Sequence, residues 1–269
     1  MRVLIEADEL AALLDDVTLL DVRWKLGGPP GHGEYLQGHI PGAVYVDLDT
    51  ELAAHGAPTD GRHPLPSLEA LQASARRWGV RAGRPVVAYD ATGNTAAARA
   101  WWLLRWAGVP DVRLLDGGLA AWSGELATDD VVPEPGDIEL RGGALPLVEL
   151  DDVPKLAERG VLLDARAGER YRGEVEPIDP RAGHIPGARS APTTENLAPD
   201  GRFLAPDALR ERFAALGADG SRLVGVYCGS GVTAAHEIAA LAIAGVDAAL
   251  YPGSFSQWSN HEHLPVATA

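Results

Sequence analysis

Residues 224–236 read VGVYCGSGVTAAH, and the rest of the chain can be organised around this stretch. The apolar run 223–227 predicts a buried strand, and residues 234–244, rich in alanine, isoleucine and leucine, predict a helix. The short loop between them carries Gly229 and Gly231, which allow its backbone N–H groups to turn inward. A concave ring of N–H groups at the start of a helix is typical of an anion-binding site.

Cys228 stands at the beginning of this loop and is the only cysteine in the chain. Inward N–H groups and the helix dipole would stabilise its thiolate, which is the nucleophilic form of cysteine. The plain alternative is a small buried residue that ends a strand. Because the glycines, the strand-to-helix switch and the thiol coincide, we favour a reactive cysteine.

The length and composition exclude several classes of protein. A chain of 269 residues suits two domains of roughly 130 residues each. The formal net charge of −15 argues against nucleic acid or an anionic membrane as a partner. No apolar run approaches the roughly 18 residues of a membrane span, and the N-terminus lacks a signal-peptide pattern, so we expect a cytoplasmic protein. A single cysteine excludes an internal disulfide and a cysteine-based zinc cluster.

Four segments recur in the same order in the two halves of the chain. LLDVR at 19–23 returns as LLDAR at 162–166, GHIPGA at 38–43 returns at 183–188, residues 86–96 match 224–234, and residues 116–122 match 252–258. The third match places Asp90 opposite Cys228. Four matches in one order indicate a tandem duplication.

Each copy predicts alternating strands and helices. Helices are expected at 7–14, 68–78, 150–158 and 206–216, each followed by a short apolar strand or loop. Such alternation predicts an α/β fold in which each half is a parallel sheet with helices on both faces. Ligands of such sheets bind beyond the C-terminal strand edge, where the Cys228 loop falls. We predict domains at 1–125 and 147–269, joined by a linker at 126–146 that has proline, glycine and no periodicity.

The order of the repeats, the Asp-x-Arg and GHIPGA segments and the Cys-x-x-Gly-Val-Thr loop together resemble two-domain rhodanese-type sulfurtransferases over nearly the whole chain. In that family the C-terminal copy carries the nucleophile and the N-terminal copy has lost it, as with Cys228 and Asp90. The loop is similar to that of the 3-mercaptopyruvate sulfurtransferase branch. Thiosulfate-preferring members typically carry basic residues at the positions of Gly229 and Ser230. The resemblance implies tandem rhodanese-like domains, the first of them non-catalytic, and no metal or cofactor.

The resemblance also implies roles for individual residues. Arg170 matches an arginine that binds the substrate carboxylate, and Arg181 is the candidate for a second one after a shortened Glu-Pro stretch. Asp49 and His63 match an aspartate and a histidine proposed to form a relay with Ser230; an exposed loop carboxylate and a turn histidine are the alternatives. The remaining residues expected around the substrate are those of the loop: Gly229, Gly231, Val232 and Thr233.

The implied reaction is covalent and has two steps. A small anionic donor, expected to be 3-mercaptopyruvate, leaves a persulfide on Cys228 and releases pyruvate. The sulfur then passes to a thiol, either a small thiol or a thioredoxin-like protein, or to cyanide. Thiosulfate is the nearest alternative donor, and a non-enzymatic sulfur carrier or binding module is a further alternative. A cysteine phosphatase would need an arginine where this chain has Ala234, so that class is disfavoured.

Overall fold

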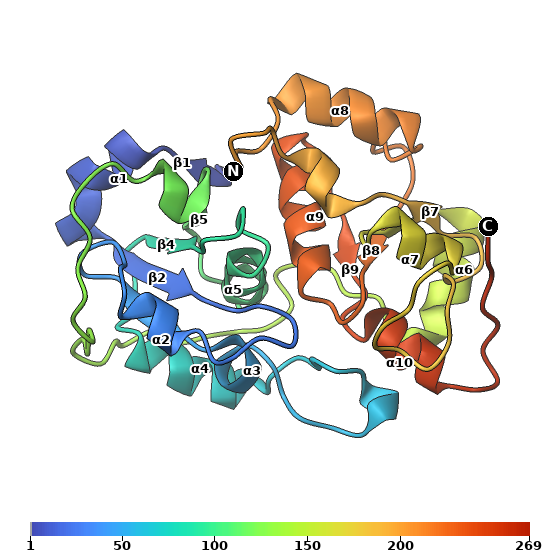
Figure 1. Ribbon diagram of the computed structural model, residues 1–269, viewed down its shortest axis with the longest axis horizontal. Coiled ribbons are helices and arrows are strands. Elements are labelled where there is room, and N and C mark those ends of the chain that lie inside the picture. Colours follow the sequence, from blue (N-terminus) through green and yellow to red (C-terminus); the bar gives the residue numbers. More distant parts are fainter. Residues whose placement is uncertain (1) are drawn as a thin grey trace. The chain divides into compact units, whose positions relative to one another are not determined.

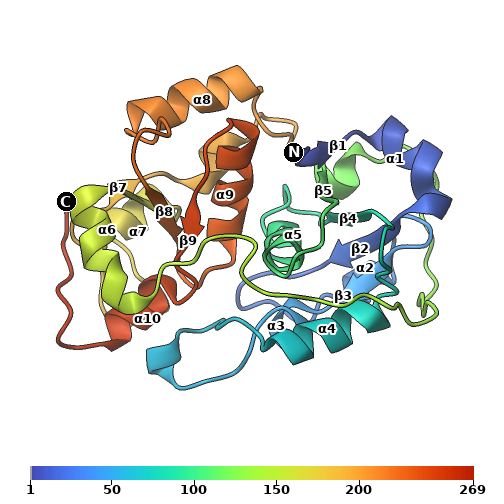
Figure 2. The same ribbon diagram turned by 180° about the vertical axis from the view of Figure 1, so that it is seen from behind.

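The computed structural model describes residues 2–269 and divides the chain into two compact units (Figures 1 and 2). The first unit comprises the chain up to Ala54, Leu65–Leu145 and Pro199–Arg202. The second comprises His55–Pro64, Pro146–Ala198 and Phe203–Ala269. No helix among the described residues is long and apolar enough to cross a membrane.

The first unit is built on a five-stranded parallel sheet with the order β1-β5-β4-β2-β3. Its strands are β1 (Leu4–Ile5), β2 (Thr18–Val22), β3 (Val44–Val46), β4 (Val86–Tyr89) and β5 (Val112–Leu115). Its α-helices are α1 (Ala7–Leu13), α2 (His32–Tyr35), α3 (Leu48–Glu51), α4 (Leu68–Arg77) and α5 (Ala97–Trp106), with 3₁₀ turns at Leu14–Asp16 and Gly118–Ala121.

The second unit repeats this design with a four-stranded parallel sheet in the order β7-β6-β8-β9. Its strands are β6 (Val161–Asp164), β7 (Arg189–Ser190), β8 (Val224–Tyr227) and β9 (Ala249–Leu250). Its α-helices are α6 (Val153–Arg159), α7 (Gly168–Arg172), α8 (Pro206–Ala215), α9 (Thr233–Ile243) and α10 (Ser254–Asn260), with 3₁₀ turns at Pro58–Asp60, Leu150–Asp152 and Thr193–Asn196.

The two sheets confirm the predicted duplication and the α/β class. The order β3-β2-β4-β5 in the first unit corresponds to β7-β6-β8-β9 in the second. A parallel bridge from Leu147 to Leu250 even repeats the pairing of Leu4 with Leu114. One expected boundary was wrong: Leu223 is largely exposed, and the strand begins only at Val224.

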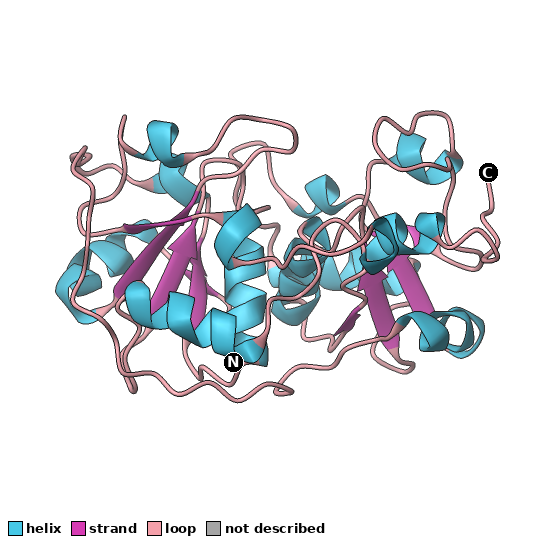
Figure 3. Cartoon of the chain, turned by 90° about the horizontal axis from the view of Figure 1, so that it is seen from below, coloured by secondary structure: helices cyan, strands magenta, loops and turns pink. Residues whose placement is uncertain are grey.

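Both faces of the central strands are buried, which explains their continuous apolar sequences. Val87 and Tyr89 of β4 pack with Leu10 of α1, and the alternating Val86 and Ala88, also fully buried, point to the opposite face. In β8 the residue Gly225 leaves room for Leu156 of α6, because a Cβ there would collide with the leucine side chain. Figure 3 shows helices on both sides of the strands in each unit.

Helix α9 carries a buried polar pair one turn beyond the Cys228 loop. His236 is fully buried, its Nδ1 lies 2.7 Å from the Thr193 hydroxyl, and its ring stacks on Phe203. Glu237 is also fully buried and accepts a 2.6 Å hydrogen bond from the Asn196 side-chain amide. Burial raises the pKa of Glu237 to about 7, against the opposing effects of Arg212 and Asn196.

This carboxyl group should make the stability of the protein depend on pH. Because the pKa of Glu237 is higher in the folded than in the unfolded state, the folded state holds the proton more tightly, and its contribution is greatest below about pH 4.5. That contribution is lost as the pH rises toward 7. We expect Glu237→Gln to remove this loss and to raise the free energy of unfolding at pH 8 by up to about 3 kcal/mol.

Urea unfolding at pH 5.5 and pH 8 tests this expectation, with Glu195→Gln as the matched control. Glu195 is an exposed carboxylate that pairs with Arg212. Equal pH dependence in Glu237→Gln and the wild type would contradict the prediction.

Candidate active site

Cys228 lies in the tight loop between β8 and α9 and is almost completely buried. The backbone N–H of Gly231 donates a 3.1 Å hydrogen bond to its Sγ. Gly231 has φ +79°, and a Cβ there would collide with the carbonyl oxygen of Pro252. Only glycine fits both constraints without strain, so this residue fixes the inward turn of the N–H group toward the sulfur.

The turn that leads into α10, together with the first residues of that helix, holds the backbone of the Cys228 loop. The Ser254 hydroxyl accepts a 3.1 Å hydrogen bond from the backbone N–H of Cys228 and donates to the Tyr251 carbonyl at 2.9 Å. The backbone N–H groups of Phe255 and Ser256 donate to the carbonyls of Cys228 and Gly229, at 3.0 and 2.8 Å. The backbone of the nucleophile is therefore held on both its donor and its acceptor side.

Sequence reasoning did not find Ser254, although the duplication carried a signal for it. Ser254 has φ +54°, a left-handed conformation that is uncommon for a residue with a side chain. Its counterpart in the first copy is Gly118, with φ +59°. A serine at a position where the other copy needs glycine indicates that its hydroxyl has a use that offsets the strain, here the bond to Cys228.

Ser230 and His63 lie side by side, as the resemblance implied. His63 Nδ1 is 2.7 Å from Ser230 Oγ. The segment His55–Pro64 that carries this histidine belongs to the second unit, although its neighbours in the chain belong to the first. The N–H of Arg62 anchors it by donating to the Ser256 hydroxyl at 3.1 Å, and His261 Nε2 lies 3.1 Å from the carbonyl of Thr59.

Asp49, the third member of the predicted relay, lies in α3 of the first unit. Its carboxylate accepts a 2.9 Å hydrogen bond from the indole N–H of Trp24. The relay of Asp49 with His63 and Ser230 therefore stays a prediction.

The side chain of Arg181 reaches the C-terminal end of α10 and the residues just after it, where it donates to backbone carbonyls. Its Nε, Nη1 and Nη2 donate at 2.7–2.9 Å to the carbonyls of Ser259, Leu264, Trp258 and His261. An arginine in this position satisfies the carbonyl groups that a helix end leaves without partners. Binding a substrate carboxylate would require Arg181 to give up these bonds.

Arg170 belongs to a cluster of alternating charges. Its guanidinium contacts the Glu176 carboxylate at 2.7 and 3.2 Å and the Asp179 carboxylate at 3.3 Å. Asp179 also accepts a hydrogen bond from Arg62, and Glu176 lies 3.3 Å from Arg166. Arg62 was not among the residues predicted from sequence, where only its position before His63 could have drawn attention to it.

Arg62 and Arg170 both reach the Cys228 loop at Gly229. A Cβ on Gly229 would lie 2.8 Å from Nη2 of Arg62 and 3.4 Å from Nη1 of Arg170. The residues of the loop itself are uncharged, yet two guanidinium groups from other segments lie against it. A glycine at this position leaves the space that these groups occupy.

The two carboxylates of the cluster differ in their environment. Burial would raise the pKa of Glu176, but hydrogen bonds from Arg170 and from the backbone N–H groups of Asp179 and Ile178 outweigh it and lower that pKa. Burial raises the pKa of Asp179, and the charges of Arg62 and Arg170 oppose it without cancelling it. Glu176 thus binds backbone N–H groups as well as arginine, whereas the described partners of the Asp179 carboxylate are arginines.

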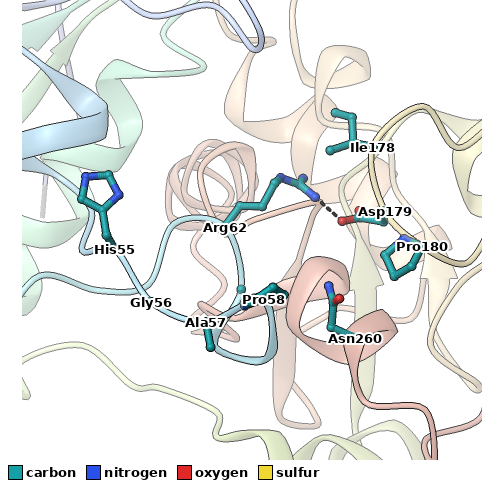
Figure 4. A pocket seen from close by; sticks show the side chains of 10 residues that line it. His55, Gly56, Ala57, Pro58, Arg62, Ile178, Asp179, Pro180 and Asn260 are labelled. Atoms are coloured by element: carbon teal, nitrogen blue, oxygen red, sulfur yellow. Dashed lines mark hydrogen bonds and ion pairs between the residues drawn. The ribbon is translucent and has the colours of Figure 1, made fainter.

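A cavity of about 380 Å³ adjoins this cluster (Figure 4). It is lined by His55, Gly56, Ala57, Pro58, Gly61, Arg62, Ile178, Asp179, Pro180 and Asn260. In Figure 4 the side chain of Arg62 extends across to Asp179. Arg62 therefore contacts the cavity as well as Gly229.

In the corresponding loop of the first unit, the Asp90 side chain occupies the position where an anion would bind. The Asp90 carboxylate accepts hydrogen bonds of 2.7–3.0 Å from the backbone N–H groups of Thr92, Asn94, Ala96 and Ala97. The loop of the first copy thus turns four N–H groups toward one anion. This is the behaviour that the glycines and the strand-to-helix switch predict for such loops.

Comparisons with known proteins agree with this architecture. The rhodanese-like domain family matches residues 6–125 and 149–261. A Mycobacterium tuberculosis protein named putative thiosulfate sulfurtransferase SseB is 49% identical, with 98% of this chain and 96% of that protein covered. A Pseudomonas aeruginosa protein named probable 3-mercaptopyruvate sulfurtransferase is 47% identical, with 98% of both chains covered.

A solved structure shows the same fold. The crystal structure of SseA from Escherichia coli, described as a 3-mercaptopyruvate sulfotransferase, has a TM-score of 0.85 at 34% identity, covering 95% of this chain and 99% of that one. The chain therefore belongs to the rhodanese family: it is a sulfurtransferase with a rhodanese-like domain in each half.

Proposed function

We propose that this sulfurtransferase takes sulfur from 3-mercaptopyruvate, forms a persulfide on Cys228 and releases pyruvate. The observation that carries the proposal is the contact of Ser230 with His63 beside the thiol, at 2.7 Å. A hydroxyl held by an imidazole can supply a proton or a hydrogen bond to a leaving group. The relatives named 3-mercaptopyruvate sulfurtransferase support this choice of donor.

In the first step the Cys228 thiolate attacks the sulfur of the donor. An S–S bond forms, the donor's C–S bond breaks, and its electron pair passes to carbon to give the enolate of pyruvate. Ser230 donates to this enolate as charge develops, with His63 behind it and Asp49 as the predicted third member. The Gly231 N–H, already donating to Sγ, stabilises the anionic sulfur.

We assign the donor carboxylate to Arg170 together with Arg62. Both guanidinium groups lie against Gly229, and arginine can bind a carboxylate through two parallel hydrogen bonds. Arg181 is the weaker candidate, because its donors bind four backbone carbonyls in and just after α10. The backbone of residues 229–233 would surround the sulfur.

In the second step an acceptor thiolate attacks the outer sulfur of the persulfide. The S–S bond breaks, the acceptor leaves as its own persulfide, and Cys228 returns as a thiolate. Cyanide would take the same sulfur and leave as thiocyanate. Two half-reactions through a covalent intermediate predict ping-pong kinetics.

Thiosulfate is the second candidate donor, and one observation favours it. It is a dianion, and Arg62 and Arg170 provide cationic groups beside Gly229 that the loop residues do not. The M. tuberculosis relative named putative thiosulfate sulfurtransferase points the same way. Against it, Glu176 and Asp179 neutralise both arginines, and thiosulfate releases sulfite, which needs no proton from Ser230.

A side-by-side assay of the two donors with one acceptor tests the choice. We expect a higher kcat/KM for 3-mercaptopyruvate than for thiosulfate. Ser230→Ala should lower kcat/KM for 3-mercaptopyruvate by about 10²-fold, since it removes a positioned donor, while thiosulfate use changes little. A tenfold preference of the wild type for thiosulfate, or an equal loss with both donors in Ser230→Ala, would contradict the proposal.

A further inference from the structure

Six side chains of the second unit form a continuous row of alternating charge. Asp164 contacts Arg166 at 2.6 Å, and Arg166 reaches Glu176 at 3.3 Å. From Glu176 the row continues through Arg170 and Asp179 to Arg62, which ends against Gly229 and the cavity of Figure 4. Three acids alternate with three bases, so the row as a whole carries no net charge.

The two acids near the loop, Glu176 and Asp179, differ in whether their carboxylates bind the backbone. The Glu176 carboxylate accepts hydrogen bonds from the backbone N–H groups of Ile178 and Asp179, at 3.2 and 3.0 Å, and so shapes its own turn. The described hydrogen bonds and ion pairs of the Asp179 carboxylate are with Arg62 and Arg170 alone. Asp179 is buried, and this burial is costly for a carboxylate.

Asp179 lies where its negative charge acts directly on the two arginines beside the Cys228 loop. It bridges the two arginines that lie against Gly229, the loop residue next to the nucleophile. An anion that approaches the Cys228 loop on this side meets two guanidinium groups whose charge Asp179 and Glu176 already compensate. The position can hold an asparagine of the same shape without loss of a backbone hydrogen bond.

We propose that Asp179 sets the charge of the donor that the site accepts, favouring a monoanion over a dianion. This inference rests on the proposed function, since it concerns the choice between 3-mercaptopyruvate and thiosulfate. The Asp179 carboxylate lowers the positive potential beside Gly229, so that the single negative charge of a donor such as 3-mercaptopyruvate is enough to balance what remains. Donor selectivity then depends on a residue outside the Cys228 loop.

Coulomb's law gives the size of the expected change in donor preference. Replacing Asp179 by asparagine adds one positive charge beside the loop, and the attraction of a dianion to that charge is twice that of a monoanion. For a partly hydrated site at a few ångströms the difference amounts to about tenfold in relative kcat/KM. Salt screens this term, so it should diminish at high ionic strength.

The experiment compares Asp179→Asn with the wild type using 3-mercaptopyruvate and thiosulfate and one acceptor. We expect the ratio of kcat/KM for thiosulfate to that for 3-mercaptopyruvate to rise about tenfold in Asp179→Asn, and the rise to shrink in 0.5 M salt. Asp179→Glu, which keeps the charge, should stay near the wild-type ratio. Asp207→Asn, which removes an exposed carboxylate paired with Arg210 on α8, is the matched control and should leave the ratio unchanged.

The outcomes separate this inference from the proposed function. A wild-type preference for 3-mercaptopyruvate with an unchanged ratio in Asp179→Asn would overturn the role of Asp179 alone. A ratio that rises equally in Asp179→Asn and Asp179→Glu would assign the effect to shape and would also overturn it. A wild type that prefers thiosulfate would overturn the proposed donor, whatever Asp179→Asn does.

Discussion

Cys228→Ser is expected to abolish sulfur transfer and to leave the fold unchanged. Cys228 is the only cysteine of the chain, so no second thiol can take over the sulfur. Serine is almost the same size, and its hydroxyl can still accept the Gly231 N–H bond that Sγ accepts at 3.1 Å. A serine hydroxyl, however, does not form the S–S bond that the first half-reaction requires. Loss of the nucleophile should cost at least about 10³-fold in kcat.

Mass spectrometry supplies a direct measurement of the intermediate. After exposure to donor and removal of the excess, the wild type should carry one added sulfur atom and Cys228→Ser none. Both proteins should unfold in a single cooperative transition, and their free energies of unfolding should differ by less than about 3 kcal/mol, the usual range for one substitution. Turnover by the serine variant above a hundredth of the wild-type rate would disprove the covalent mechanism.

The features that follow from local pattern could be predicted from sequence. Alternating strands and helices, repeated in four matched segments, predict two parallel sheets of one design, whereas the order of the strands is known only from the structure. The Cys228 loop could be identified because glycine spacing, helix start and thiol lie within a few residues. In each case the decisive interactions are made by residues near one another in the chain.

The features that depend on distant segments could not be predicted in the same way. Arg62 reaches Gly229 because His55–Pro64 joins the second unit while its chain neighbours join the first. Nothing local marks Arg62 as a partner of Asp179, which lies more than a hundred residues further along. Arg181, selected by its place near the Glu-Pro stretch, donates to backbone carbonyls in and just after α10, contacts that are not apparent from sequence, and its role toward the substrate stays a prediction.

The net charge of the side chains around Gly229 also could not be predicted from sequence. The loop residues carry no charge, and Arg170 and Arg181 were the cations expected from sequence. The structure places Arg62 beside Gly229 together with Arg170, and two carboxylates, Glu176 and Asp179, compensate these two guanidinium groups. The charge beside Gly229 is therefore the sum over four side chains from separate segments of the chain, and the proposed role of Asp179 in donor choice rests on that sum.

Asp90→Ala is expected to destabilise the protein strongly while leaving the chemistry in place. The Asp90 carboxylate accepts four backbone N–H groups in its loop, at 2.7–3.0 Å, and three of their residues, Asn94, Ala96 and Ala97, are buried. Alanine would leave these donors without an acceptor. Since a hydrogen bond to a charged group contributes about 1.5–3 kcal/mol, and water or a solute anion can replace part of the loss, we expect a cost of about 3–5 kcal/mol.

Chemical unfolding with and without formate can separate this cost from other effects of the substitution. If the lost interaction is that of an anion with its ring of N–H groups, formate at high concentration should restore part of the stability of Asp90→Ala. Formate should not stabilise the wild type, in which the Asp90 carboxylate already occupies the ring.

Asp90→Asn keeps one oxygen for Thr92 and Asn94 but turns an amide N–H₂ toward Ala96 and Ala97, so its stability should fall between those of the wild type and Asp90→Ala. Under conditions where each variant is folded, kcat should stay close to wild type, because the nucleophile and Ser230 lie in the second unit. Wild-type stability in Asp90→Ala would show that the carboxylate is not what holds this loop. A folded Asp90→Asn with greatly reduced kcat would instead show that the first copy of the loop, although it has no thiol, takes part in the reaction.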